Sequence, residues 1–221
     1  MSERPALGRF KQRSEARLMH MAPATPQAAV RLRMPPGLRM DDAQFYAFCR
    51  ENPDYRIERD IQGEIEIMPP TGAETGRRNT DLVTELNLWA RADGSGFVFD
   101  SSTGFRLPNG ATRSPDAAWV ARHRLAGLGA EDKERFLPLA PDFVVELASP
   151  NDDPDKLADK MAEYRACGVR LGWLLLPAAS QARIYRPAAL PSVVEGPRVL
   201  DGGDVLPGFR LDLGLIWASV L

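Results

Sequence analysis

The sequence predicts one domain of the mixed α/β class (α+β), in which a mixed β-sheet is flanked by helices. Two helical stretches, residues 75–92 and 155–166, lie between groups of short strands. Residues 143–148 are almost entirely apolar, as expected for a central strand that is covered on both faces. The resulting order of helix, strands, helix, strands, helix, strands favours helices packed on a sheet.

The first half of this domain opens with a helix, which Asp41 or Asp42 caps and which continues to Glu51. Residues 55–60 and 64–68 then alternate apolar and polar side chains on either side of a Gln-Gly turn, which predicts a hairpin. The helical period that follows ends at a glycine, a common helix terminator. Three short strands come next, at residues 97–101, 104–107 and 114–120, with the turn 108–110 joining the last two.

In the second half, residues 121–138 mix charged and apolar side chains, which indicates a loop with a short helix. A strand at 143–148 and a helix at 155–166 follow. The remaining elements are strands at 171–176 and 181–185, a late strand near the end, and a short terminal helix containing Trp217.

Composition excludes several classes of protein. The chain has 221 residues, of which 44% are hydrophobic and 26% charged, values that suit a soluble domain with a substantial core. Its two cysteines are far apart and no Cys-x-x-Cys occurs, which argues against a disulfide framework and structural zinc and favours a cytoplasmic location. No apolar run is long enough to cross a membrane.

The charge is uneven along the chain. Residues 1–39 hold eight basic and two acidic residues, a net charge of +6, so the remainder carries −8 of the total of −2. We predict that residues 1–37 form a basic, disordered tail and that residues 38–221 form the single domain. An early start codon and a nucleic-acid-binding arm are alternative interpretations of the tail. The acidic remainder argues against tight non-specific binding of duplex DNA, which needs clustered Lys and Arg.

Three residues carry the predicted chemistry: Asp116, Glu146 and Lys160. Both acids lie on short apolar runs that resemble buried strands, where a carboxylate is costly unless a cation or hydrogen-bond donors meet it. Mg²⁺ commonly binds through one or two carboxylates together with water and substrate phosphate. If the two strands are neighbours and the helix bearing Lys160 packs over them, the three side chains form a site for a divalent ion and a phosphate ester. Strand-end acids with a surface lysine are the structural alternative.

Other kinds of site find less support. The two histidines, His20 and His123, fall in the tail and in a polar loop, and neither has a plausible nucleophile as a partner. The sequence also lacks a phosphate-binding glycine loop that follows a strand. A serine hydrolase and a dinucleotide-binding protein are therefore disfavoured.

Three segments that include these residues, Arg-Ser-Pro-Asp-Ala-Ala-Trp-Val, Pro-Asp-Phe-Val-Val-Glu-Leu-Ala-Ser-Pro and Asp-Lys-Met-Ala-Glu-Tyr-Arg-Ala-Cys-Gly-Val, carry a family resemblance. So do the earlier Gly-Glu-Ile-Glu-Ile-Met-Pro-Pro-Thr-Gly and the late Leu-Pro-Gly-Phe. In this order, over about residues 40 to 215, the chain resembles the Uma-type restriction endonuclease family of the PD-(D/E)XK nuclease superfamily.

The resemblance implies a restriction-endonuclease-like core that hydrolyses DNA phosphodiester bonds with Mg²⁺ (or Mn²⁺) held by Asp116 and Glu146. It also implies that the basic residue of the superfamily has moved from the strand, where Ala148 stands, to Lys160 on the next helix. DNA is the implied partner, a homodimer is compatible with it, and no membrane is involved. The rival interpretation is a catalytically weak or inactive module that binds nucleic acid or protein.

Secondary candidates surround these three residues. Glu74, at the start of the first long helix, matches the region where the superfamily often adds another metal-binding acid, although a first-turn glutamate is also favoured by the helix dipole. Lys156 lies one turn before Lys160 and could replace it. Asp142 lies four residues from Glu146, about 13 Å along a strand. It is therefore expected to stabilise the start of that strand.

Overall fold

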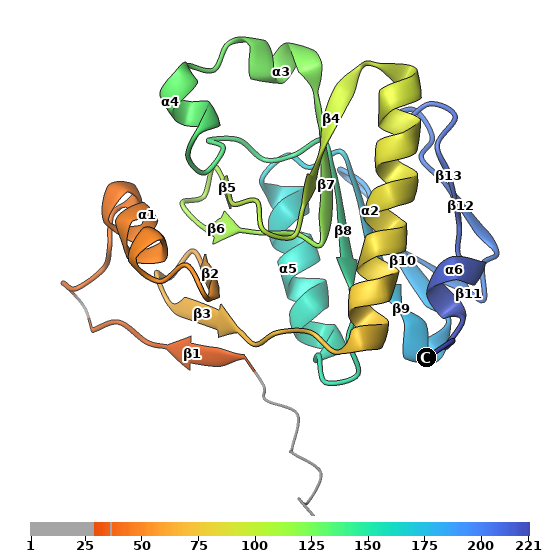
Figure 1. Ribbon diagram of the computed structural model, residues 1–221, viewed down its shortest axis with the longest axis horizontal. Coiled ribbons are helices and arrows are strands. Elements are labelled where there is room, and N and C mark those ends of the chain that lie inside the picture. The colour runs from red at the N-terminus through yellow and green to blue at the C-terminus, as the bar shows by residue number, and fades with distance from the viewer. Residues whose placement is uncertain (1–28, 36) are drawn as a thin grey trace, which may run out of the picture.

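The computed structural model describes residues 29–35 and 37–221. Its centre is a six-stranded sheet in the order β11-β10-β9-β8-β7-β4, in which β8 and β9 are parallel and all other neighbours are antiparallel. Figure 1 shows α5 on one side of this sheet and α2 on the other. The expected mixed sheet flanked by helices is confirmed. The strands have the bounds β4 Gly96–Asp100, β7 Ala117–Ala121, β8 Phe143–Leu147, β9 Leu171–Leu176, β10 Gln181–Tyr185 and β11 Ser192–Glu195.

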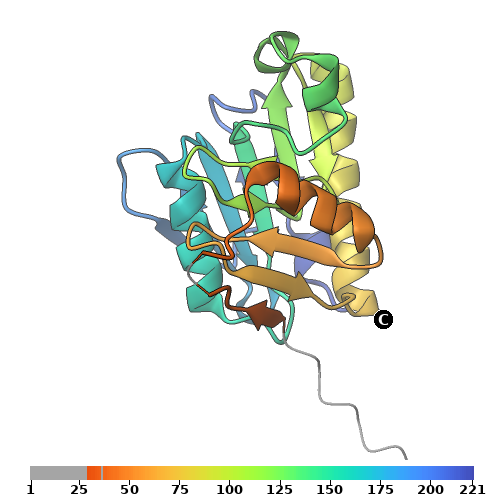
Figure 2. The same cartoon turned by 90° about the vertical axis from the view of Figure 1, so that its left-hand side faces the viewer.

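A second, antiparallel sheet of five strands in the order β1-β3-β2-β6-β5 lies on the α5 side. In Figure 2 its β2–β3 hairpin lies toward the viewer, with α1 across it. The outer face packs Ile57 and Ile65 against Phe45 of α1. These elements have the bounds β1 Val30–Leu32, α1 Asp42–Glu51, β2 Arg56–Arg59, β3 Ile65–Met68, β5 Phe105–Arg106 and β6 Thr112–Arg113.

Several local predictions for this region hold. Asp41 caps α1 through a reciprocal pair of hydrogen bonds with Gln44, a capping box. The hairpin turn at residues 60–64 places Gly63 in the left-handed region, with φ of 83°. The turn at 108–110 leads to the two-residue strand β6, however, and not to the predicted strand 114–120, of which only β7 from Ala117 onward forms. Pro115, which has no N–H for a strand ladder, lies between the two strands.

The predicted tail also differs from the structure at one place. Val30–Leu32, which the sequence assigned to the tail, pairs with β3 as an edge strand. Arg31 on this strand forms an ion pair with Glu66 of β3 at 3.2 Å. The expected disorder of the basic segment concerns mainly residues 1–28, which lie outside the described residues.

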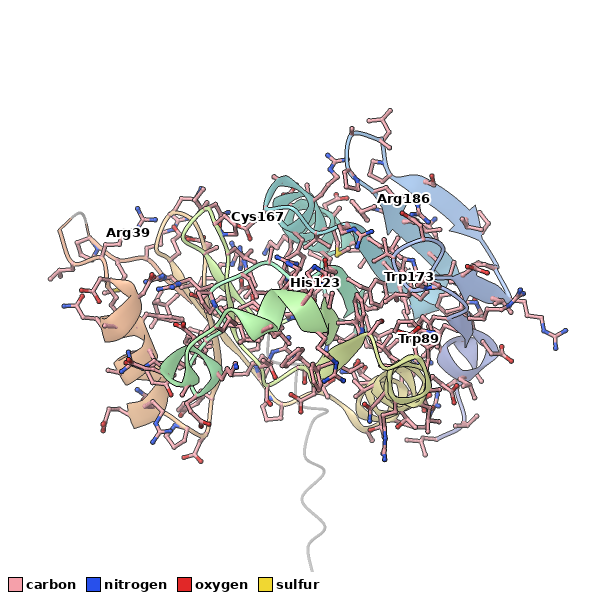
Figure 3. All side chains as sticks on the ribbon, turned by 90° about the horizontal axis from the view of Figure 1, so that it is seen from above. Arg39, Trp89, His123, Cys167, Trp173 and Arg186 are labelled. Atoms are coloured by element: carbon pink, nitrogen blue, oxygen red, sulfur yellow. The ribbon has the colours of Figure 1, made fainter. Side chains whose placement is uncertain are left out.

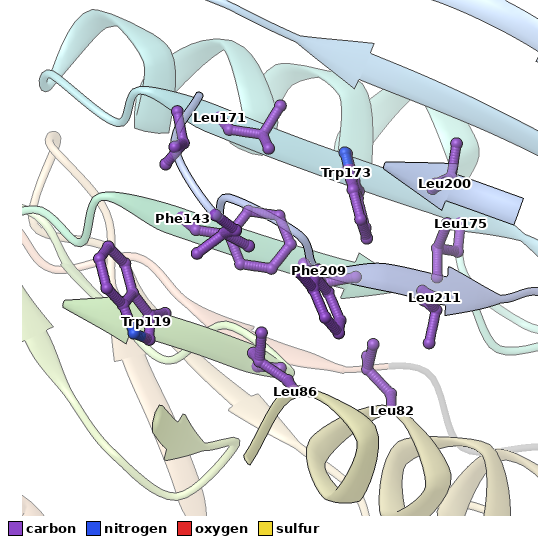
Figure 4. Close-up of a cluster of buried hydrophobic side chains, with 14 of the residues drawn as sticks. Leu82, Leu86, Trp119, Phe143, Leu171, Trp173, Leu175, Leu200, Phe209 and Leu211 are labelled. Atoms are coloured by element: carbon purple, nitrogen blue, oxygen red, sulfur yellow. The ribbon is translucent and has the colours of Figure 1, made fainter. Parts of the chain in front are cut away.

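The main core lies between the central sheet and α2 Ala73–Asp93. Figure 4 shows Leu82 and Leu86 of this helix facing the large side chains of the sheet and of the C-terminal segment. Trp173 of β9 stacks on Phe209 with their ring centroids 5.9 Å apart. The remaining elements have the bounds α3 Arg122–Ala126, α4 Ala130–Lys133, α5 Pro154–Ala166, the short 3₁₀ helix Pro177–Ala179, β12 Val199–Asp201, β13 Arg210–Asp212 and α6 Gly214–Trp217.

The opposite face of the central sheet packs on α5 through a separate apolar cluster that includes Val144, Met161 and Leu174. Figure 3, seen from above, shows Trp89 and Trp173 on the α2 side and Cys167 at the end of α5. Both cysteines are free thiols. Among the described residues, no helix has the length and apolar character needed to span a membrane.

Candidate active site

Strand register brings Asp116 and Glu146 together. In the antiparallel pair of β7 and β8, Ala117 lies opposite Val145. Continuing that register by one residue places Asp116, which immediately precedes β7, opposite Glu146. Directly opposed side chains lie on the same face with their Cβ atoms about 5 Å apart. The alternation along both strands turns this face toward α5, since Ala118 and Val144 belong to the cluster packed on that helix.

Two donors hold the Asp116 carboxylate. The backbone N–H of Leu147 donates to Oδ2 at 2.8 Å, across the strand pair. On the other side, Arg56 Nη1 donates to Oδ1 at 3.3 Å, from β2 of the second sheet. Asp116 is therefore fixed by the central sheet through one oxygen and meets a cation through the other.

Helix α5 supplies two partners to Glu146, one through an ion pair and one through a hydrogen bond. Lys160 Nζ lies 2.9 Å from Glu146 Oε1, and the Tyr164 hydroxyl donates to the same oxygen at 2.9 Å. The two partners are four residues apart, one above the other on one helix face. Because α5 connects the parallel strands β8 and β9, the helix must pack back over the strand that bears Glu146. Lys160 thus reaches the acids as the sequence analysis required, and its side chain is 13% exposed.

Ala148 stands where the superfamily pattern has a lysine. It lies just past β8 and packs at the edge of the same α5-facing cluster. A lysine there would start on the correct face, but the ammonium group in this chain comes from the helix. The Lys156 side chain, the other candidate, is exposed at the start of α5.

Glu58 is a fourth member of the site that the sequence analysis missed. It is 1% exposed and lies on β2, two residues after Arg56, so the two side chains share a face of that strand. Its Oε1 accepts from Lys160 Nζ at 2.9 Å and from the backbone N–H of Ser114 at 3.0 Å. Its Oε2 meets Arg113 at 3.2 Å. Lys160 is therefore shared between an acid of each sheet.

The electrostatics of these two acids differ. Burial alone would raise the pKa of Glu58, but the charges of Lys160, Arg113 and Arg56 outweigh it and lower that pKa to about 2. For Glu146, burial is the largest effect and the neighbouring charges of Asp116 and Glu58 add to it, so its pKa rises to about 7 in spite of Lys160. Burial lowers the pKa of Lys160, yet the two glutamates raise it overall, which keeps the amine protonated.

Glu74 has different neighbours. At the start of α2, its carboxylate forms ion pairs with Arg77 at 2.7 Å and with Arg78 at 3.5 Å. It also accepts a hydrogen bond from the backbone N–H of Leu221. None of these partners is a member of the group around Glu146, and the role of Glu74 as a further metal ligand stays a prediction.

Asp142 has a structural position, as expected. It is 3% exposed and lies just before β8. Its Oδ2 accepts from the backbone N–H of Ala121 at 2.9 Å and meets Arg124 at 3.2 Å. These contacts tie the start of β8 to the end of β7, at the opposite end of the strand from Glu146.

The donor set can be tested against a divalent ion. No group of three or more His, Cys, Asp and Glu residues within the described ranges forms a complete metal-binding cluster. Mg²⁺ does not need one, since two carboxylates with water and phosphate suffice. Asp116 and Glu146 are two such carboxylates on one face, and across the described residues no donor forms a hydrogen bond to Glu146 Oε2. The acids therefore fit a hard cation.

Two surface hollows lie elsewhere. One, of about 340 Å³, is lined by Tyr46 and Arg106 among others, and the second, of about 460 Å³, by Arg39 and Ile61. Both include Asp42 at the start of α1 and neither is lined by Asp116, Glu146 or Lys160. Neither hollow belongs to the candidate site, which is defined by its charged side chains.

Comparison with known proteins gives a family and a fold. The family model Uma2, described as "Putative restriction endonuclease", matches residues 42–214. A crystal structure described as a putative nuclease belonging to DUF820, from Anabaena variabilis, superposes with a TM-score of 0.63 at 17% sequence identity, over 73% of this chain and 89% of that one. No curated protein matches. With more than three quarters of its length matched, the chain belongs to the Uma2 family of restriction-endonuclease-like proteins.

Proposed function

We propose that this protein is a metal-dependent nuclease that hydrolyses phosphodiester bonds of DNA, with Asp116 and Glu146 as ligands of Mg²⁺ or Mn²⁺ and Lys160 as the catalytic cation. Membership of a family described as "Putative restriction endonuclease" supports a hydrolase acting on phosphodiester bonds. The observation that carries the proposal is the convergence of these residues, with Lys160 Nζ 2.9 Å from Glu146 beside its opposed neighbour Asp116.

A divalent ion bound to the two acids would supply Lewis-acid stabilisation of the phosphate charge and an acidified water. The protein residues supply the rest. Asp116 is oriented by the Leu147 N–H, and Glu146 by the Tyr164 hydroxyl. Because its pKa is raised, Lys160 stays an ammonium group and acts as a charged hydrogen-bond donor to the phosphate or to the attacking water, not as a base.

The rival function is a non-catalytic module that binds nucleic acid or protein. The alanine at position 148 favours it, since the usual strand lysine is missing. The position of Lys160 weighs against it, because a lysine without a role in the site would be expected in solvent, whereas this one is held between Glu58 and Glu146.

Purified protein incubated with supercoiled plasmid or single-stranded DNA in Mg²⁺ or Mn²⁺ tests the proposal. Nicking is expected with the wild type and should fall by about 100-fold or more in Asp116→Asn and Glu146→Gln. Asp204→Asn, whose side chain is 79% exposed in the segment after β12, is the control and should cleave normally. Cleavage that survives in both site variants would refute the assignment, and absence of cleavage by the wild type would leave only the binding module.

A further inference from the structure

The three cations around the candidate acids are not held equally. Lys160 lies 2.9 Å from both Glu58 and Glu146, and Arg113 lies 2.6 Å from Glu163 and 3.2 Å from Glu58. Their side chains are only 13% and 10% exposed. Arg56 is 31% exposed and its ion pairs are longer, 3.3 Å to Asp116 and 3.9 Å to Glu58. Arg56 therefore has the longest ion pairs and the most exposed side chain of the three, although its Nη2 also donates to Ser114 O at 2.5 Å.

The hydrogen-bond donors of the Arg56 guanidinium group are also incompletely satisfied. Its Nη2 donates to the carbonyl oxygen of Ser114 and its Nη1 to Asp116. Its Nε is buried and has no hydrogen-bond partner among the described residues. A charge-assisted hydrogen bond is usually 2.7–2.9 Å long, and an unsatisfied buried donor is costly. The hydrogen-bonding capacity of Arg56 is therefore only partly used in this position, and a move that gives Nε a partner would offset part of the loss of the contacts with Ser114 and Asp116.

The oxygen that Arg56 contacts is the one that a metal ion would use. Asp116 Oδ2 is engaged by the Leu147 N–H, which leaves Oδ1 for a cation. A guanidinium group cannot vacate the site by losing its proton, so it must move when a second cation arrives. A guanidinium group also matches the geometry of a phosphate anion, which would be the nearest new partner in a nuclease.

We propose that Arg56 is an exchangeable counter-ion. It holds Asp116 in the metal-free protein, competes with the divalent ion for that carboxylate, and turns to the substrate phosphate once the ion binds. This inference rests on the proposed function. It makes Arg56 a residue with opposite effects on the two ligands: it weakens metal binding and strengthens DNA binding.

Mn²⁺ binding, followed by electron paramagnetic resonance on the full chain without DNA, tests the first half. Arg56→Met should bind Mn²⁺ at least about tenfold more tightly, because a positive charge within a few ångströms of a divalent ion is removed. Arg56→Lys, which keeps the charge, should fall between it and the wild type. Arg106→Met removes an arginine of similar exposure that pairs with Asp42, and should leave the affinity unchanged. Adding Asp116→Asn to Arg56→Met should abolish the gain.

DNA binding in Ca²⁺, followed by fluorescence anisotropy, tests the second half. Arg56→Met should bind DNA about tenfold more weakly although it binds the metal more tightly, and Arg56→Lys should retain most of the affinity. A folded Arg56→Met, with the melting temperature of the wild type, that binds Mn²⁺ no more tightly would overturn the proposal. If Arg56→Met does not fold, an Arg56→Lys affinity no tighter than that of the wild type overturns it instead.

The two hypotheses fail separately. A wild-type protein that binds Mn²⁺ but cleaves no DNA would refute the nuclease function, and the order of Mn²⁺ affinities would still decide whether Arg56 competes. Unchanged DNA binding by an Arg56→Met protein with tighter Mn²⁺ binding would refute the transfer to phosphate alone.

Discussion

The raised pKa of Glu146 makes the stability of the metal-free protein depend on pH. Its ordinary value is 4.5 and its value in the fold is about 7, because the side chain is buried beside Asp116 and Glu58. The folded state therefore binds this proton more tightly than the unfolded chain does. The stabilisation from that proton is complete below pH 4.5 and is lost as the pH rises through 7. At about 1.4 kcal/mol per pKa unit, the rise from 4.5 to about 7 corresponds to about 3 kcal/mol.

Glu146→Gln removes this dependence and keeps the shape of the side chain. Its amide oxygen can still accept from Lys160 and Tyr164, the two donors that contact Oε1 in the wild type. We therefore expect the free energy of unfolding of the variant, relative to the wild type, to increase by about 2 kcal/mol between pH 5 and pH 8. The stability of the variant, compared with that of the wild type, should therefore be greatest at pH 8.

Urea denaturation in EDTA, at pH 5, 6, 7 and 8, measures this difference. Asp159→Asn is the control, because Asp159 lies on the same helix with its side chain exposed to solvent. A difference between Glu146→Gln and the wild type that stays constant over this range, or that decreases with pH, would show that Glu146 is ionised in the fold at low pH. The electrostatic account of the site would then be wrong.

Three further outcomes are expected. Lys160→Met should reduce plasmid nicking by about 100-fold or more, while Lys160→Arg should retain part of the activity, because the positive charge of the side chain is needed and not its length. An equal loss in both variants would contradict the role of Lys160 as the catalytic cation. Tyr164→Phe should destabilise the protein by about 1–2 kcal/mol in urea melts through the lost hydrogen bond to Glu146, and no change would mean that the bond is not formed. Gly96→Ala should lower the free energy of unfolding by about 2 kcal/mol, since the added Cβ would lie 2.4 Å from Val120 O. Gly76→Ala, in helix α2, should instead raise it by up to about 1 kcal/mol, and equal effects of the two substitutions would argue against the close packing at Gly96.

The elements that position the acids could be predicted because their patterns are local. The predicted strands at 171–176 and 181–185 agree with β9 and β10, and β8 differs from its prediction by one residue. Apolar runs of this length, bounded by Pro, Gly and Asp, have few alternatives in a chain of this size. The proximity of Asp116 to Glu146 followed from the assumption that the strands bearing them pair with each other.

Glu58 could not be predicted in the same way. The alternation along residues 55–60 correctly assigned opposite faces to Ile57 and Glu58, but it does not tell what covers each face. The polar face of a hairpin is normally interpreted as exposed to solvent. Here it packs toward Lys160 and Arg113, and the long-range arrangement of the two sheets decides that outcome. A buried ion network leaves no periodic signal in the sequence.

The contacts of Glu74 also divide into one that a local pattern predicts and one that it does not. Its place in the first turn of a helix was read correctly, and Arg77 one turn along the helix was a visible partner. The contact with the backbone of Leu221 depends on where the end of the chain lies, which no local pattern determines.

The division of the charged group between two sheets has a consequence for heat inactivation. Arg56 and Glu58 come from the hairpin side, whereas Asp116 and Glu146 come from the central sheet, and few apolar residues join the hairpin to α1. A region with a small core can open locally before the whole molecule melts. Loss of the proposed nuclease activity on warming is therefore expected several degrees below the cooperative loss of helix signal, and it should reverse on cooling.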